Sequence, residues 1–241
     1  MHQFHDALVS FAERRDISMK ILCFGDSNTY GFIPGEGGRY DRKTRWTGRL
    51  KMLLGENCRI MEDGLNGRTT VFEEELCPGR CGLDDIGAAV ELSEPLDLLI
   101  LMLGTNDCKN LFSASAEDIA KGIETVLKKA LDTSDKPFQT LLIAPAPLTE
   151  RVSKGSFWPE FDENSRLRSE ALAGEYRKVA EKFHCEFLDA GTVTKVSDVD
   201  GVHLDEEGHK ALAEAVAGRI RKQTINSAIR KLENEDIQVR L

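Results

Sequence analysis

The amino-acid sequence lacks a hydrophobic run long enough to cross a membrane. Its most apolar stretch, residues 96–103, is interrupted by Asp97, whereas a spanning helix needs about 20 apolar residues. Residues 2–18 also lack the continuous apolar segment of a signal peptide, because charged side chains and histidines are spread through them. We therefore expect a cytoplasmic protein that does not act at a membrane.

The chain also lacks an excess of positive charge. It has 32 Lys and Arg against 41 Asp and Glu, which gives a formal net charge of −9. Nucleic-acid binding depends on cationic side chains that displace counterions from phosphates, so DNA and RNA are not expected as partners. The length of 241 residues and a hydrophobic content of 41% are typical of one folded domain with a sizeable core.

Cysteine is present, but not in a pattern typical of a metal site. The six cysteines are scattered, and only Cys77 and Cys81 lie close together, in the segment CPGRC. A zinc knuckle has a C-x2-C spacing and a second pair of Cys or His ligands, and neither accompanies this segment. In a reducing compartment such cysteines act as small buried hydrophobic residues. We therefore expect neither a metal nor a disulfide.

Strand and helix patterns alternate along the chain, which indicates a parallel sheet with helices on both faces. Right-handed crossovers leave few topologies. We predict an α/β fold of the three-layer α/β/α, flavodoxin-like kind, with five parallel strands in the order 2-1-3-4-5. The predicted strands are residues 20–24, 58–62, 96–103, 140–144 and 185–188, and the predicted helices are residues 44–54, 116–131, 165–183 and 205–222.

The sequence divides into one main domain and an extension at each end. Residues 1–18 are the N-terminal extension, in which residues 3–14 have the apolar spacing of an amphipathic helix. Residues 19–222 form the predicted domain. Residues 223–241 are a polar and highly charged tail, which we expect to be helical or flexible.

Polar residues follow the first three predicted strands and precede the last predicted helix. In a doubly wound parallel sheet, ligands bind at the carboxyl ends of the strands. Four segments that are distant in the sequence are therefore expected to meet at one edge of the sheet. They are residues 25–28 (GDSN), 64–69 (GLNGRT), 104–107 (GTND) and 200–203 (DGVH).

These segments supply each group that cleavage of an ester requires. Ser27 can attack the carbonyl carbon, His203 can accept the serine proton, and Asp200 can orient and stabilise the imidazole. Candidate donors for the developing oxyanion are the backbone N–H groups of Ser27 and Gly67 and the side-chain amide of Asn106. Gly67 lacks a Cβ, which lets its backbone come close to a substrate.

Each segment alone also has a purely structural interpretation. Gly-Asp-Ser can be a strand-to-turn signal, Asn106 can form an Asx turn or cap a helix, and Asp-Gly is a common turn pair. His184 and His209 fit surface or capping positions, and only His203 follows a carboxylate within a predicted turn. The joint occurrence of four segments with separate chemical roles favours the catalytic interpretation.

Taken together, the four segments resemble the signature blocks of the SGNH (GDSL-like) hydrolases. The four letters correspond here to Ser27, Gly67, Asn106 and His203, and the resemblance covers roughly residues 19–222. It is closest to the arylesterase/acyltransferase branch, because ILCFGDS, RWTG, GLNGRTT, MLGTND-x-K and the DAG and DGVH segments stand in matching places.

The resemblance implies a Ser-His-Asp mechanism in which Asp200 is the acidic member and no metal or other cofactor takes part. It also implies that the acyl and alcohol pockets are lined by further side chains near these segments. The residues in matching positions are Asn28, Tyr30, Lys109 and Val202.

Members of this branch act on small esters, and some transfer the acyl group to alcohols or peroxide. They are often oligomers in which the loop before the penultimate helix shapes a neighbour's channel. Residues 148–165, with Trp158 and Phe161, stand in the corresponding place, and long loops of this kind are typically functional or interface-forming. The resemblance therefore implies a homo-oligomeric serine esterase that hydrolyses, and can transfer, small acyl groups.

Three other functions stay open at this point. The same fold hosts carbohydrate O-acetylesterases. A metal-dependent phosphoesterase could use Asp26, Asp107, Asp200 and His203 as ligands, although Ser27 would then have no role. An inactive binding module on the same scaffold is the third alternative, since a fold alone does not establish activity.

Overall fold

The computed structural model of the protein describes the backbone of residues 19–239 and the side chains of residues 19–225. The predicted N-terminal extension, residues 1–18 with its helix, lies outside this range, as do residues 240–241 of the predicted tail. No helix in the described part of the chain is both long enough and apolar enough to cross a membrane.

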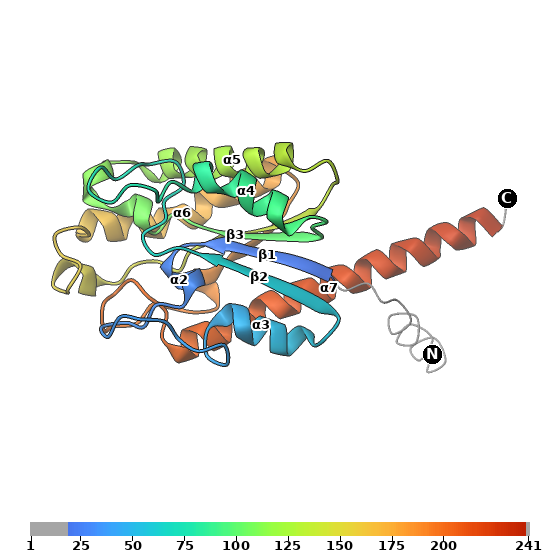
Figure 1. Ribbon diagram of the computed structural model, residues 1–241, viewed down its shortest axis with the longest axis horizontal. Helices are drawn as coiled ribbons and strands as arrows, with labels where there is room; N and C mark the ends of the chain where they lie inside the picture. Colours follow the sequence, from blue (N-terminus) through green and yellow to red (C-terminus); the bar gives the residue numbers. More distant parts are fainter. Residues whose placement is uncertain (1–18, 240–241) are drawn as a thin grey trace.

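Five parallel strands form one sheet in the order β2-β1-β3-β4-β5, and helices cover both of its faces (Figure 1). The predicted fold class and strand order are therefore confirmed. All five residues of β3 are buried, because helices pack on both of its sides. The strands are β1 (Met19–Gly25), β2 (Cys58–Gly64), β3 (Leu98–Met102), β4 (Gln139–Ala144) and β5 (Glu186–Asp189).

Helices α4, α5 and α6 lie on one face of the sheet, and α3 and α7 lie on the other (Figure 1). The helix that we predict over residues 205–222 continues as one helix to Val239 and carries the chain away from the sheet. A short helix, α2, follows β1. The helices are α2 (Ser27–Tyr30), α3 (Trp46–Leu54), α4 (Gly82–Ser93), α5 (Ala116–Thr133), α6 (Glu163–Lys182) and α7 (Glu206–Val239).

The sheet separates two apolar cores, because successive residues of a strand point to opposite faces. In β3, Leu99 and Leu101 pack toward α4, α5 and α6, whereas Leu98 and Ile100 pack toward α3 and α7. Each such side chain contributes about 1.5–3 kcal/mol to the free energy of unfolding when it is fully buried. Strong apolar packing on both faces therefore fixes the central strands, and with them the turns at their ends.

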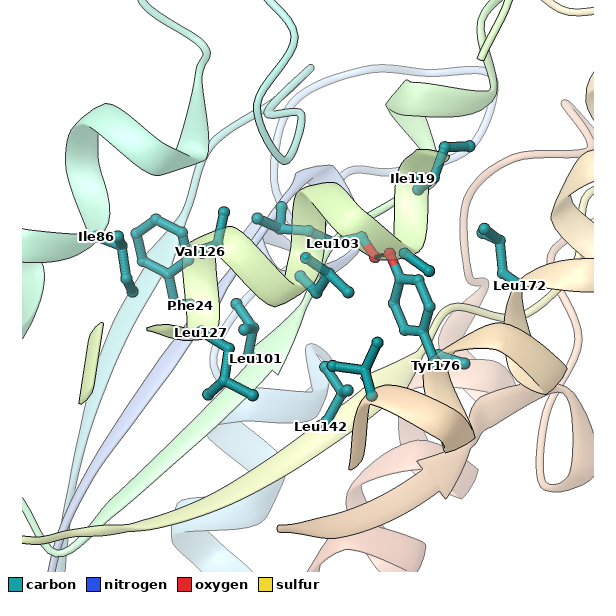
Figure 2. Close-up of a cluster of buried hydrophobic side chains, with 14 of the residues drawn as sticks. Phe24, Ile86, Leu101, Leu103, Ile119, Val126, Leu127, Leu142, Leu172 and Tyr176 are labelled. Carbon is teal, nitrogen blue, oxygen red and sulfur yellow. Dashed lines mark hydrogen bonds between the residues drawn. The ribbon is translucent and has the colours of Figure 1, made fainter. Parts of the chain in front are cut away.

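One buried tyrosine links the larger core to the turn after β3. Figure 2 shows Tyr176 of α6 pointing its ring toward Leu103. Its hydroxyl donates a hydrogen bond of 3.0 Å to the Leu103 carbonyl. A Cβ on the next residue, Gly104, would lie 2.4 Å from that hydroxyl. Close packing therefore holds the turn that leads to Asn106.

The helix α4 has no counterpart among the predicted helices. It makes the crossover from β2 to β3 and buries Ile86 and Val90 against the sheet. Its sequence contains Gly82 and Gly87, which weaken helical propensity, and its N-cap residue, Cys81, forms no side-chain capping bond. Tertiary packing, rather than a local signal, forms this helix.

Of the two interpretations of His209, as a surface residue or as a capping residue, the surface one is wrong. The side chain is fully buried between α3 and α7. Its Nδ1 accepts a hydrogen bond of 3.3 Å from the backbone N–H of Trp46, the first residue of α3. Burial lowers the pKa of the imidazole to about 3, and the positive charge of Arg49 acts in the same direction. His209 is thus a neutral cap for a neighbouring helix.

This burial makes His209 a source of acid sensitivity. The folded pKa of about 3 lies below the unfolded value of 6.5, so the unfolded state binds the extra proton and the free energy of unfolding falls as the pH drops below 6.5. We expect the variant His209→Asn, whose side-chain oxygen can still accept the Trp46 N–H, to lose less stability in acid. The difference should grow by about 1.4 kcal/mol per pH unit. Urea unfolding of both proteins at several pH values measures this difference. If the free energies of unfolding of the two proteins changed equally with pH, His209 would not be the source of the acid sensitivity.

Candidate active site

The carboxyl ends of three adjacent strands lie level with one another. Gly25 at the end of β1 pairs with Gly64 of β2 and with Met102 of β3. A Cβ on Gly25 would lie 2.1 Å from Thr29 Oγ1, and a Cβ on Gly64 would lie 2.1 Å from the Tyr30 backbone nitrogen. The α2 turn is therefore packed directly onto the strand ends, and the predicted meeting of segments at this edge is observed.

Ser27, His203 and Asp200 form a continuous chain of hydrogen bonds. His203 Nε2 lies 2.9 Å from Ser27 Oγ, and His203 Nδ1 lies 2.8 Å from Asp200 Oδ2. All three residues are buried, and Asp200 is fully so. The structure thus places a nucleophile, a base and an orienting carboxylate in the geometry that nucleophilic catalysis needs.

Asp200 is held in its ionised form by the turn in which it lies. Burial acts to raise the pKa of this carboxyl, but the hydrogen bond from His203 and the backbone N–H groups of His203 and Val202 outweigh it and lower the pKa. Both of those N–H groups donate to Asp200 Oδ1, at 3.0 and 2.9 Å. The other oxygen, Oδ2, is left to bind the imidazole.

Asn28 holds the backbone around His203 in place. Its Nδ2 donates to the Val202 carbonyl at 3.2 Å, and its Oδ1 accepts from the Leu204 N–H at 2.9 Å. The two bonds hold the residues on either side of His203 against the residue next to Ser27. Asn28 therefore positions the base relative to the nucleophile.

A hollow of about 190 Å³ opens beside Ser27, and Gly67 and Asn106 also border it. Gly67 has a φ of 80°, a left-handed conformation that favours glycine. Asn106 Nδ2 donates to the Arg68 carbonyl at 3.0 Å, which fixes its amide while a second N–H stays available. The three residues that are predicted to supply the oxyanion donors thus all border one small space.

Aromatic rings from two loops cover the imidazole. The ring centroid of Phe32 lies 4.4 Å from that of His203, and the centroid of Phe157 lies 5.4 Å from it. The sequence predicts a functional role for the loop of residues 148–165, which contains Phe157, but gives no signal for Phe32, because side chains in irregular loops have no periodic pattern. The loop residues that border the hollow are Phe32, Asn66, Arg80, Phe157, Glu160 and Phe161.

The four residues that the resemblance assigns to the substrate pockets fall into two groups. Lys109 and Val202 border the hollow. Asn28 and Tyr30 do not border it; Asn28 makes the two hydrogen bonds described above, and the Tyr30 ring packs under the guanidinium of Arg39. The structure therefore brings two of the four to the hollow, and a third, Asn28, supports the histidine instead.

Two carboxyl groups are buried directly beneath the site. Asp26 accepts the backbone N–H of Asn28 at 2.9 Å, and Asp107 accepts the backbone N–H of Thr70 at 2.9 Å and the Thr70 hydroxyl. Burial is the main cause that raises the pKa of each carboxyl to about 6. The Asp26 bond caps the short helix that carries Ser27, and the Asp107 bonds connect the Asn106 turn to the segment after Gly67.

The metal-dependent alternative finds no support in the arrangement of its ligands. Both oxygens of Asp200 and both nitrogens of His203 already have partners. Across residues 19–225, the one group of three such side chains close enough to share an ion is Glu73, Cys81 and Asp84, none of which borders the hollow beside Ser27. The six cysteines are free thiols.

Comparison with protein families identifies the class. The model of the GDSL-like lipase/acylhydrolase family matches residues 23–211, which include Ser27, Gly67, Asn106 and His203. The chain belongs to this family. The resemblance that the four segments indicate is therefore confirmed at the level of the family.

Several esterases are similar to this chain. An aryl esterase from M. smegmatis shares 32% identity with a TM-score of 0.81, covering 85% of this chain and 99% of that one. A carbohydrate acetylesterase from Sinorhizobium meliloti shares 30% identity with a TM-score of 0.80, covering 86% of this chain and 100% of that one. An acetylxylan esterase from Xylanibacter ruminicola is 23% identical over 248 residues, which cover 91% of this chain and 48% of the relative. The chain thus spans about half the length of this curated relative.

Asp107 gives the site a measurable effect of pH on stability. Its folded pKa of about 6 lies above the ordinary value of 3.8, so the folded state binds the extra proton and the free energy of unfolding falls as the pH rises from 3.8 through 6. Above that interval the cost reaches about 3 kcal/mol. We expect Asp107→Asn, which cannot ionise, to gain stability relative to the parent protein by up to that amount between acid and neutral pH. Chemical unfolding of both proteins in acid and at neutral pH tests this prediction. A difference in the free energy of unfolding that stays constant with pH would show that the Asp107 carboxyl does not have a raised pKa.

Proposed function

We propose that the protein is a serine esterase that cleaves small carboxylic esters through a covalent acyl-Ser27 intermediate. The observation that carries the proposal is the hydrogen-bonded series Asp200–His203–Ser27 beside a hollow that Gly67 and Asn106, the other residues predicted to bind the oxyanion, also border. Membership of the GDSL-like family and the similarity to an aryl esterase support it.

In the acylation step, Ser27 Oγ attacks the ester carbonyl carbon while its proton moves to His203 Nε2. The negative charge that develops on the carbonyl oxygen is stabilised by the N–H groups of Ser27 and Gly67 and the amide of Asn106. Asp200 stabilises the imidazolium and keeps the ring oriented. The proton then passes from Nε2 to the leaving alcohol as the C–O bond breaks.

In the deacylation step, His203 takes a proton from water, and the resulting nucleophile attacks the acyl-Ser27 carbonyl. The proton returns to Ser27 Oγ as the acid departs. An alcohol in place of water would give acyl transfer by the same sequence of proton movements. The apolar rings of Phe32 and Phe157 over His203 favour an organic acceptor, so we include transfer in the proposal.

A carbohydrate O-acetylesterase is the second candidate. The structural similarity to a carbohydrate acetylesterase and the sequence similarity to an acetylxylan esterase favour it. The chemistry on Ser27 is identical, and only the alcohol differs. Rates on an aryl acetate and on acetylated xylose, measured side by side, separate the two candidates.

We also propose that the protein works in the cytoplasm as a homo-oligomer. Trp158, in the loop that forms part of the site, is 62% exposed, although its neighbours Phe157 and Phe161 line the hollow. A large exposed aromatic ring at the rim of a site is a typical contact residue between subunits.

Replacement of the nucleophile is the first test. We expect Ser27→Ala to lower the turnover of para-nitrophenyl acetate by about 10⁴- to 10⁶-fold, because no acyl intermediate can form. The matched control is Ser93→Ala, which removes a buried hydroxyl of α4 that bonds only within its own helix. A fluorophosphonate should label the parent protein and the control, but not Ser27→Ala. Unchanged turnover in Ser27→Ala would overturn the proposed function.

Replacement of the acid tests the role of the hydrogen-bond series. We expect Asp200→Asn to lower kcat on the order of 10⁴-fold, because an amide stabilises the wrong tautomer of His203. Its shape is nearly unchanged, so circular dichroism should report a folded protein. A variant that keeps most of its kcat would show that Asp200 does not serve the imidazole.

A further inference from the structure

One arginine lies in the hollow without any assigned role. Arg80 comes from the segment between β2 and α4 and borders the space beside Ser27. Its guanidinium rests on Gly67, because a Cβ on that glycine would lie 2.6 Å from Arg80 Nη1. A full positive charge is therefore placed next to one of the oxyanion donors.

The backbone of Arg80 is fixed to the same segment. The Arg80 carbonyl accepts the backbone N–H of Thr69 at 3.0 Å and the Thr69 hydroxyl at 3.3 Å. Thr69 also pairs with Cys81 in a short parallel bridge. The backbone of Arg80 is thus fixed, and its side chain extends over Gly67. An arginine in a mobile surface loop would have neither constraint.

The guanidinium of Arg80 has no hydrogen-bond acceptor and no ion-pair partner among residues 19–225, whose side chains the structure describes. The neighbouring Arg68 differs: its guanidinium donates to Asp63, Asp85 and two carbonyl groups. Five N–H donors in a planar fork suit a carboxylate or phosphate. The donors of Arg80 are left for a ligand.

The lysine and the glutamate that border the hollow already form ion pairs. Lys109 Nζ lies 2.9 Å from Glu74 and 3.1 Å from Glu160. Glu160 is half exposed, and it pairs with Lys109 rather than with Arg80. Of the charged side chains that border the hollow, Arg80 is thus the one that can bind an anion without breaking an existing ion pair.

We propose that Arg80 binds an anionic group of the substrate, so that the site favours esters that carry a carboxylate or a similar anion close to the ester bond. The inference rests on the proposed esterase function and specifies its substrate class. The anion can belong to the acyl part or to the alcohol part; both give the same contact with the guanidinium, and the experiment separates them.

The test compares matched pairs of esters that differ in one charge. Para-acetoxybenzoate and its methyl ester place the charge on the alcohol side, and mono-para-nitrophenyl succinate and its methyl ester place it on the acyl side. The quantity measured is the ratio of kcat/KM for the anionic ester to that for the neutral one. Arg59→Gln is the control, because it removes the same charge from an exposed position on β2.

We expect Arg80→Gln to lower this ratio at least about tenfold for one of the pairs, since hydrogen bonds to charged groups contribute that much or more. Arg80→Lys, which keeps the charge but loses the planar fork, should give an intermediate ratio. Arg59→Gln should leave the ratio within about twofold of the parent value.

Two results would overturn the inference. An unchanged ratio for both pairs in Arg80→Gln would show that the guanidinium does not meet the anion. An equal loss on the anionic and the neutral ester would show that Arg80 acts on the oxyanion of every substrate. In either case, if hydrolysis of the neutral ester still depends on Ser27, the proposed esterase function is retained. Unchanged turnover in Ser27→Ala would contradict both the esterase function and the role of Arg80.

Discussion

The hydrogen-bond series from Asp200 through His203 to Ser27 is the interaction on which the rest of the structure depends. It joins the turn after the first strand to the turn before the last helix, and those turns lie far apart in the chain. Asn28 makes the junction rigid, because one side chain next to the serine bonds the residues before and after the histidine. A neighbouring amide, rather than the triad alone, sets the distance between base and nucleophile.

The sheet makes this junction possible. Parallel pairing places the ends of β1, β2 and β3 at one level, and apolar cores on both faces hold the strands in register. Buried polar groups then connect the turns: Asp107 bonds Thr70, Tyr176 bonds Leu103, and Asn106 bonds Arg68. Each of these bonds lies where water is excluded, so each partner would be costly to lose. The site is thus a group of polar residues at the edge of a sheet whose two faces are packed with apolar side chains.

Much of the fold and the centre of the site could be predicted from the sequence, because both have local signals. Buried strands are short apolar runs, and Ser27 follows the first strand while His203 precedes the last helix, each in a recognisable segment. The rest depends on contacts between distant segments. Helix α4 has two glycines and no side-chain cap, His209 is buried only because α3 packs on α7, and Phe32, Phe157 and Arg80 reach the hollow from irregular loops. No periodicity in the sequence encodes such contacts.

The tight packing of Gly25 and Gly64 has a consequence for how relatives of this chain should be judged. A side chain at either position would collide with the α2 turn whether or not the protein catalyses anything. The first letter of the GDS signature therefore reports on steric fit between a turn and its sheet, and only the serine reports on chemistry. A descendant that had lost its activity would be expected to retain both glycines. The presence of these glycines in a relative is therefore evidence of the same fold, and only the serine is evidence of activity.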